Sequence, residues 1–348
     1  MPREPSKYIH LSSREDRAVS KFYKPYSDDR LICTLCQHYC KIKKNQTGIC
    51  GVNKNIGDKI ECLVYGYPSA LAVDPIEKKP LYHFLPSSKA FSLGTVGCNF
   101  RCSFCQNWQI SQSVNIDKSR YFSPEDIVRL AIENSSASIA YTYNEPTIFY
   151  PYARDIALQA KEHSIKSIFV TNGYESKEVV DDMVGIIDGA NIDLKSFNSL
   201  YYKKNLGGNL QKVLDTIKHF VKNGIWVEIT TLIVPSQNDT KEELRDIANF
   251  IAKELGVHIP WHISAFHPDY KEQNLPRTSI QMLQRAYDIG KEAGLYYIYM
   301  GNIGVENPTN CPKCHKTVIQ REYFGVTKNS RIDGKCPSCG YKIEGVFQ

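Results

Sequence analysis

The chain has 348 residues and a formal net charge of +6, from 43 basic and 37 acidic side chains. Hydrophobic residues make up 42% and charged residues 23% of the sequence, which is typical of a folded globular protein. No apolar run approaches the roughly 18 residues of a membrane-spanning helix, and residues 1–5 do not begin a secretory signal. We therefore expect a soluble, cytoplasmic protein without a membrane partner. The mild, dispersed positive charge does not favour nucleic-acid binding.

The twelve cysteines are the unusual feature of this composition. Eleven of them fall into three groups with short spacings, and Cys62 stands alone. A disulfide scaffold is normally much smaller than this chain. Short spacings between cysteines in an intracellular chain indicate metal sites. The sequence therefore predicts a metalloprotein with up to three metal centres.

The first cysteine group lies in residues 1–89, a turn-rich segment that we expect to form a small appendage. Its members are Cys33, Cys36, Cys40 and Cys50. Four thiolates at this spacing fit either zinc or an auxiliary iron–sulfur cluster, with His38 as an alternative ligand. We expect Cys62 to be a small buried hydrophobic side chain.

Residues 90–300 alternate between short apolar segments and segments with helical signals. Seven apolar segments have the length of buried parallel strands: 90–96, 138–143, 166–171, 190–194, 225–234, 261–266 and 295–300. Ser123 and the proline and acids after it form a helix start, and Gly224 and Gly294 are placed to end helices. About six strand–helix units are fewer than the eight of a complete barrel. We predict an α/β fold, a partial (β/α)6 barrel with two small metal-binding appendages.

The second cysteine group follows the first predicted strand of this barrel. Cys98, Cys102 and Cys105 have the spacing C-x3-C-x2-C, which places three thiolates on one short loop at the end of a strand where α/β barrels hold their chemistry. Three thiolates leave one iron of a four-iron cluster without a protein ligand, so a substrate or cofactor can coordinate there. A zinc site completed by a distant ligand is the alternative.

This loop, with Phe104 in its aromatic position, resembles the C-x3-C-x-aromatic-C signature of radical S-adenosylmethionine (SAM) enzymes. The resemblance implies that Cys98, Cys102 and Cys105 bind a [4Fe–4S] cluster and that SAM chelates the fourth iron. In that family the reduced cluster cleaves SAM to methionine and a 5′-deoxyadenosyl radical, which abstracts hydrogen from a substrate. A low-potential electron donor is therefore an implied partner, and Phe104 is expected to pack near the adenine.

Two further segments resemble SAM-binding motifs of this family. Asn144-Glu145-Pro146 stands where the family has the end of a Gly-Gly-Glu-Pro motif that binds the SAM amino group, with Asn144 in place of the second glycine. Thr171-Asn172-Gly173 resembles a Thr-Asn-Gly sequence of pyruvate formate-lyase activases. The resemblance implies that Asn144, Glu145 and Asn172 contact SAM.

The segment after the fourth predicted strand also resembles those activases. Asp193-Leu194-Lys195 matches their Asp-x-Lys, in which the lysine meets the SAM carboxylate. Alternation places Asp193 and Lys195 on the same side of an extended segment, so a structural pair between them is the alternative to a SAM contact. The activases have an aspartate where this chain has Val170, which argues against their monovalent-cation site.

Three residues near the expected barrel mouth are candidates for a catalytic role. These are Tyr143, His262 and His267. A histidine at the mouth can transfer a proton near neutral pH. A hydrogen-bonded structural histidine is the alternative.

The third cysteine group lies in residues 301–348. Cys311, Cys314, Cys336 and Cys339 form two Cys-Pro-x-Cys pairs separated by 21 residues, which predicts a zinc ribbon with four thiolate ligands. Such a metal would stabilise a segment too small for its own core. Rubredoxin-type iron is the alternative.

The cysteine-rich head, the barrel motifs and the ribbon together resemble the radical SAM enzyme of the AmmeMemoRadiSam system, a group labelled pyruvate formate-lyase activating enzyme-related. That resemblance implies an association with Memo-like and AMMECR-like proteins and names no substrate. We therefore expect a radical SAM enzyme that acts on an unidentified substrate. The alternatives are a glycyl-radical-enzyme activase and, in a different class, an RNA-binding or RNA-modifying protein.

Overall fold

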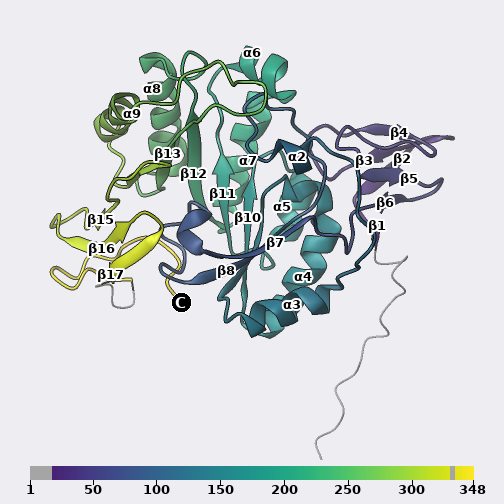
Figure 1. The fold of residues 1–348 in the computed structure, drawn as a ribbon, viewed down its shortest axis with the longest axis horizontal. Helices are drawn as coiled ribbons and strands as arrows, with labels where there is room; N and C mark the ends of the chain where they lie inside the picture. The colour runs from purple at the N-terminus through teal and green to yellow at the C-terminus, as the bar shows by residue number, and fades with distance from the viewer. Residues whose placement is uncertain (1–17, 330–333) are drawn as a thin grey trace, which may run out of the picture.

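A computed structural model describes residues 18–329 and 334–348, and it places a central sheet between two small appendages (Figure 1). The central sheet has eight strands in the order β14-β13-β12-β11-β10-β9-β8-β7. Strands β8 to β14 run parallel, and β7 pairs antiparallel with β8 at one edge. The strands are β7 Ala70–Pro75, β8 Lys89–Gly94, β9 Ser138–Tyr141, β10 Lys166–Thr171, β11 Gly189–Asp193, β12 Trp226–Ile233, β13 Trp261–Ala265 and β14 Ile298–Gly301.

The parallel part of this sheet confirms the predicted α/β fold. Each of the seven predicted segments overlaps one strand, and β10 has the predicted bounds. Strand β7 was not predicted, and it extends the sheet into the segment assigned to the N-terminal appendage. It precedes the first strand–helix unit and is largely part-exposed, so the alternation that identified the other strands does not include it.

Most of the parallel strands are connected through helices, and three of the helix ends lie at the expected signals. The helices are α2 Trp108–Ser111, α3 Pro124–Glu133, α4 Tyr150–Glu162, α5 Lys177–Met183, α6 Ser199–Tyr201, α7 Leu210–Lys222, α8 Lys241–Phe250 and α9 Ile280–Glu292. Shorter helical turns are η1 Ile76–Lys78, η2 Pro146–Phe149, η3 Tyr202–Leu206 and η4 Ile251–Leu255. Ser123 and Asp126 form a reciprocal capping box at α3. Gly224 and Gly294 follow α7 and α9 with φ of 76° and 91°, which glycine adopts without strain.

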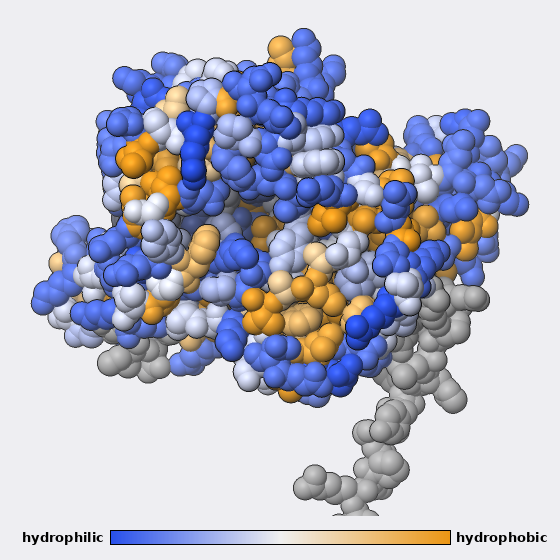
Figure 2. Space-filling view, in the orientation of Figure 1, coloured by the Kyte–Doolittle hydropathy of each residue, from blue (hydrophilic) through white to orange (hydrophobic). Residues whose placement is uncertain are grey.

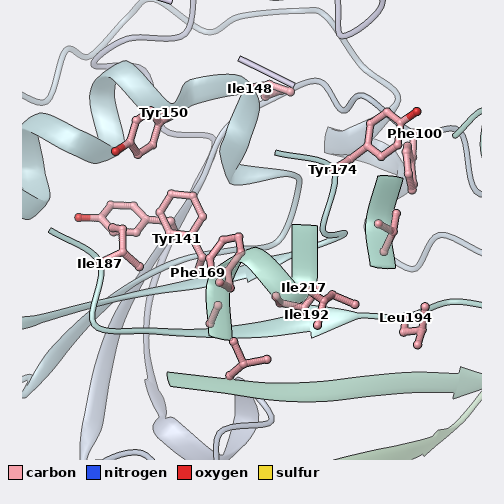
Figure 3. Close-up of a cluster of buried hydrophobic side chains, with 14 of the residues drawn as sticks. Phe100, Tyr141, Ile148, Tyr150, Phe169, Tyr174, Ile187, Ile192, Leu194 and Ile217 are labelled. Carbon is pink, nitrogen blue, oxygen red and sulfur yellow. The ribbon is translucent and has the colours of Figure 1, made fainter. Parts of the chain in front are cut away.

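The hydrophobic core lies between the sheet and these helices. Tyr141, Phe169 and Ile192 come from three neighbouring strands and approach Tyr150 of α4 and Ile217 of α7 (Figure 3). All five side chains are fully buried. Burial of one such apolar side chain contributes about 1.5–3 kcal/mol, so this layer is a main source of the stability of the sheet.

Polar side chains alternate with the core positions along the central strands. On β12, Glu228 and Thr230 point to the same face because side chains alternate along a strand. Glu228 contacts His262 of β13, whereas Thr230 and Ser264 line a common cavity two residues further along the two strands. This face therefore carries one polar layer near the amino ends of the strands and a second layer near their carboxyl ends.

The two appendages are small antiparallel sheets at opposite sides of the central sheet (Figure 1). The N-terminal one contains β2-β3-β4 and β1-β6-β5, and the C-terminal one contains β15-β16-β17. Their strands are β1 Val19–Ser20, β2 Tyr23–Ser27, β3 Arg30–Cys33, β4 Lys41–Lys43, β5 Asn53–Asn55, β6 Ile60–Cys62, β15 Thr309–Asn310, β16 Thr317–Glu322 and β17 Gly325–Asn329. Figure 2 shows mainly hydrophilic residues along the periphery of the visible surface. In the described part of the chain, every helix is too short or too polar to cross a membrane.

Candidate active site at the carboxyl ends of the strands

A cavity of about 270 Å³ opens at the carboxyl ends of the parallel strands. Its lining includes every residue predicted to hold the iron–sulfur cluster or to contact SAM: Cys98, Cys102, Phe104, Cys105, Asn144, Glu145, Asn172, Asp193 and Lys195. These residues follow four different strands, and parallel strands bring their carboxyl ends to one side of the sheet. The fold therefore gathers the predicted site residues around a single cavity.

The loop that carries the three cysteines begins at a constrained turn. Gly97 has φ of 90°, and a Cβ atom there would lie 2.7 Å from the carbonyl oxygen of Cys50. The Asn144 side chain holds this turn, because its Nδ2 donates to Thr95 Oγ1 at 3.0 Å and to the Gly97 carbonyl at 2.9 Å. Its Oδ1 accepts from the Thr95 N–H at 3.0 Å. The Asn144 side chain therefore fixes the turn before Cys98 while Asn144 also lines the cavity.

Glu145 lies in a buried hydrogen-bond network that also includes Glu175, a residue that the sequence motifs did not indicate. Its Oε1 accepts from the hydroxyls of Thr147 at 2.5 Å and Thr171 at 2.8 Å, and its Oε2 accepts from the Asn172 N–H at 2.8 Å. Glu175 Oε1 contacts the same two hydroxyls at 3.0 and 2.5 Å. Each hydroxyl has one proton to donate, so a proton on one of the carboxyl groups supplies a further hydrogen bond.

The burial of Glu145 and Glu175 favours this additional proton on the carboxyl pair. It raises the pKa of Glu145, and burial together with the charge of Glu145 raises the pKa of Glu175 to about 8. Glu175 lies two residues after the Thr171-Asn172-Gly173 segment, so its proximity to that motif was the available signal. Its contact with Glu145 depends on the fold.

Lys195 supplies positive charge to the cavity. Of the described residues that line it, Lys195 alone has a cationic side chain, and its Nζ lies 2.7 Å from Asp193 Oδ2. Burial acts to lower the pKa of Lys195, but the charges of Asp193 and Cys102 outweigh it and hold that pKa above the usual value. Leu194 between them is buried, as the alternation predicts. The ammonium group therefore stays charged and can pair with an anion.

The donors around the cavity suit a metal and a polar ligand. Burial raises the pKa of Cys98, and it raises that of Cys102 to about 12, so thiolates there need a cation such as a metal ion to be stable. The buried Thr230 Oγ1 belongs to a lining residue and has no hydrogen-bond partner within the described part of the chain. The residues present therefore fit an iron–sulfur cluster beside a polar molecule.

The structure separates the histidine candidates from the cavity. The expectation that His262 lies at the mouth is wrong, because β13 begins at Trp261 and His262 is its second residue. His262 Nε2 lies 2.7 Å from Glu228 Oε2, and both side chains are buried. His262 therefore belongs to the polar layer at the opposite ends of the strands.

The other two candidates lie nearer the cavity. Tyr143 lines it, and its hydroxyl donates to Asp74 Oδ2 at 2.9 Å. His267 does not line it, but its Nδ1 accepts from Gln106 Nε2 at 2.7 Å, and Gln106 does line it. Tyr143 therefore remains the candidate with direct access to a bound molecule.

The C-terminal cysteines form a compact group. The sulfur atoms of Cys311, Cys314, Cys336 and Cys339 all lie within 4.8 Å of one another. Tetrahedral zinc with Zn–S distances of about 2.3 Å requires thiolates this close together. This group could therefore hold one metal ion, as the sequence predicts.

The N-terminal cysteines line a second, smaller cavity. Cys62 is not among its lining residues, and its buried thiol donates weakly to the Ile148 carbonyl at 3.9 Å. Cys62 thus has the buried position that the sequence predicts.

Comparisons with known proteins agree with this geometry. Residues 92–251 match the family model of the radical SAM superfamily. The chain is 42% identical over 331 residues to an uncharacterized protein of Methanocaldococcus jannaschii, covering 94% of this chain and 98% of that protein. Residues 92–251 form a radical SAM domain. This match implies an iron–sulfur enzyme that uses a [4Fe–4S] cluster and SAM.

Further similarities are more distant. The chain is 24% identical over 189 residues to the pyruvate formate-lyase-activating enzyme of Clostridium pasteurianum, covering 51% of this chain and 77% of that enzyme. Among solved structures, a radical SAM methyltransferase from Sphaerobacter thermophilus matches with a TM-score of 0.49 and 15% identity, covering 63% of this chain and 68% of that one.

Proposed function

We propose that this chain cleaves SAM reductively and abstracts hydrogen from a substrate that the sequence does not name. The observation that carries the proposal is the single cavity bordered by Cys98, Cys102, Cys105 and Lys195. When bound, the cluster and SAM would supply a one-electron cleavage to methionine and a 5′-deoxyadenosyl radical. The electron would come from a low-potential donor protein.

The chain's own residues would hold and orient these groups. The three thiolates would bind the cluster, and Lys195 would pair with the SAM carboxylate while Asp193 holds its ammonium group in place. Asn172 Nδ2 donates to Asn99 Oδ1 at 2.7 Å, which ties the loop after β10 to the cysteine loop. We propose Asn172, like Asn144, as a positioning residue for that loop.

Anaerobic SAM cleavage tests the proposal. Reconstituted, dithionite-reduced protein is incubated with SAM, and 5′-deoxyadenosine and methionine are measured. We expect both products from the wild type and from Cys62→Ala, whose thiol lies outside the cavity, and neither from Cys102→Ala. Cleavage by Cys102→Ala at the wild-type rate would overturn the assignment. A wild type with a full cluster and no cleavage would favour the RNA-binding alternative.

A glycyl-radical activase is the second candidate function, supported by the similarity to a pyruvate formate-lyase-activating enzyme. Val170 stands where the activases have an aspartate, which counts against their cation site. Incubation of the reduced enzyme and SAM with candidate partner enzymes, followed by electron paramagnetic resonance for a glycyl radical, distinguishes this function. The resemblance to the AmmeMemoRadiSam enzymes further supports an association with Memo-like and AMMECR-like proteins, which co-purification tests.

A further inference from the structure

The four N-terminal cysteines surround one enclosed space. Cys33 ends β3, Cys36 and Cys40 lie in the turn before β4, and Cys50 lies before β5. All four line one small cavity. The remaining lining is partly apolar and includes Ile148 from the barrel. Four thiols thus face a hollow that is closed partly by the barrel itself.

The spacing of these thiols differs from that of the ribbon. Among the described residues, the ribbon cysteines are the group whose ligand atoms gather within 4.8 Å, and no three N-terminal sulfur atoms do so. A single zinc ion draws its thiolates together in a tetrahedron. An iron–sulfur cluster needs a wider cage because its thiolates bind different iron atoms. The N-terminal arrangement therefore favours a cluster over a single ion.

Amide donors lie in the wall of this cavity. Asn53 Nδ2 donates to Cys50 Sγ at 3.5 Å. Asn99, which also lines the cavity and is 2% exposed, has a buried Nδ2 with no hydrogen-bond partner in the described part of the chain. Hydrogen bonds to sulfur are one of the features that tune iron–sulfur clusters, and a cluster sulfur would give the Asn99 amide an acceptor.

The histidine in this wall has a different partner. His38 Nε2 lies 2.9 Å from the carbonyl oxygen of Asn99, so that nitrogen is engaged with the barrel. We therefore assign the four thiolates, rather than His38 Nε2, as the ligand set. Asn99 follows Cys98 directly. Cys98 lines the active-site cavity, and Asn99 lines the second cavity.

The segment that surrounds the second cavity is hydrogen-bonded to the barrel. Cys36 forms a β-bridge with Glu175, and Gln37 N–H donates to the Tyr174 carbonyl at 2.9 Å. Gly97 meets the Cys50 carbonyl, as described above. The cysteine loop of the active site is thus packed directly against the N-terminal thiol cage.

We propose that Cys33, Cys36, Cys40 and Cys50 hold a second iron–sulfur cluster next to the active-site cysteine loop. The inference does not depend on SAM cleavage, since it rests on the thiol cage alone. The class of cluster is one with four cysteine ligands, which both two-iron and four-iron clusters use.

The test removes the first cluster and asks whether a second remains. In Cys98→Ala/Cys102→Ala/Cys105→Ala, expressed full-length and purified anaerobically, we expect about two to four irons per chain with equal sulfide. Adding Cys36→Ala should remove the sulfide and the iron that accompanies it. Adding Cys62→Ala instead should leave them unchanged, because Cys62 is a nearby buried cysteine that does not line the cavity.

Two outcomes would overturn the proposal. One is a folded triple variant without iron, and the other is a triple variant with zinc beyond that of the ribbon in place of iron and sulfide. Circular dichroism checks the fold. If the triple variant does not fold, Cys36→Ala alone is compared with Cys62→Ala, and equal iron contents in these two proteins would refute the second cluster. Activity is not needed as a readout, so a failure of SAM cleavage leaves this test intact.

Discussion

At the scale of single residues, Lys195 carries the most specific expectation because it supplies the positive charge of the active-site lining. A charge-assisted hydrogen bond to a carboxylate contributes about 1.5–3 kcal/mol. We therefore expect Lys195→Ala to raise the dissociation constant for SAM roughly 10- to 150-fold, since each 1.4 kcal/mol is a factor of ten. The iron content should not change, because the thiolates lie on another loop. Equilibrium binding on anaerobic, reconstituted protein measures the dissociation constant, and metal analysis measures the iron content.

Lys166 offers a matched control for this experiment. It forms a similar lysine–aspartate pair, with Nζ 3.0 Å from Asp188 Oδ1, but it lies at the first residue of β10, away from the cavity. Lys166→Ala should bind SAM as the wild type does. Wild-type affinity in Lys195→Ala as well would mean that the Asp193–Lys195 pair is purely structural.

The buried carboxyl pair predicts a pH dependence of stability. The pKa of Glu175 is about 8 in the folded chain against a usual 4.5, so the folded state keeps a proton that the unfolded state releases at lower pH. Stability should fall as pH rises between these values. Glu175→Gln removes the titration and keeps the shape, so we expect a smaller decrease in Tm between about pH 6 and about pH 8.5 than in the wild type. Anaerobic thermal unfolding of the holoprotein measures this difference.

Glu178 is the control for that comparison. Burial acts to raise its pKa, but hydrogen bonds from Tyr39 and Lys24 outweigh it and lower the pKa, so Glu178 stays ionised over this range. Glu178→Gln should show the wild-type decrease in Tm. An equal decrease in Glu175→Gln would show that the Glu145–Glu175 pair does not hold the extra proton.

At the scale of elements, Arg321 joins the C-terminal hairpin to the barrel. Its fully buried guanidinium donates to the Tyr82 carbonyl at 2.6 Å and to Thr309 Oγ1 at 2.7 Å, and lies 3.7 Å from Glu77. Removing one partner of a buried ion pair costs about 3–5 kcal/mol because the other charge stays buried. We expect Arg321→Met to lower the free energy of unfolding by about this amount, measured by urea denaturation.

The double variant Arg321→Met/Glu77→Gln separates the charge from the packing. It should recover part of the loss, because it removes the carboxylate left without a cation. Arg129→Met is the control, since Arg129 pairs only at the surface of α3 and exposed pairs contribute little. A loss in Arg321→Met as small as that in Arg129→Met would contradict the anchoring role.

At the scale of the whole molecule, local patterns predicted the parallel sheet and the cysteine loop. Strand β10 has the predicted bounds because its apolar residues 168–170 are followed within two residues by the turn residues Asn172-Gly173. The capping box at Ser123 is likewise complete within four residues. These features need no information from distant parts of the chain, and the cysteine spacing needs only the loop itself.

Features that depend on distant partners were not predictable in this way. The Asn144 amide is held by Thr95, 49 residues earlier, so its motif position alone did not reveal that it fixes the turn before the cysteine loop. His262 lies on the same face of β13 as the cavity-lining Ser264, but it lies near the amino end of the strand. The bounds of β13, which the sequence did not fix to the residue, determine this position. The Glu145–Glu175 contact and the place of Arg321 likewise arise only when the chain is folded.

The ribbon predicts a link between metal content and the stability of the entire chain. Its buried residues Val318 and Ile319 share one hydrophobic cluster with Tyr82 and Tyr299 of the barrel. Metal binding orders such small modules, so loss of the metal should loosen this shared cluster. We expect full-length Cys339→Ser to contain about one zinc ion less per chain than the wild type and to have a lower Tm.

The position of the ribbon makes this prediction selective. Tyr299 hydrogen-bonds His83, and the backbone N–H of His83 donates to Glu228, so the ribbon is connected to the amino-end polar layer rather than to the active-site cavity. Cys339→Ser should therefore bind SAM with wild-type affinity at temperatures below its Tm. Metal analysis and anaerobic calorimetry test both parts, with Cys62→Ala as a control that keeps its zinc. An unchanged Tm after loss of the metal would show that the barrel is stable without an ordered ribbon, and loss of iron instead of zinc would identify a rubredoxin-type site.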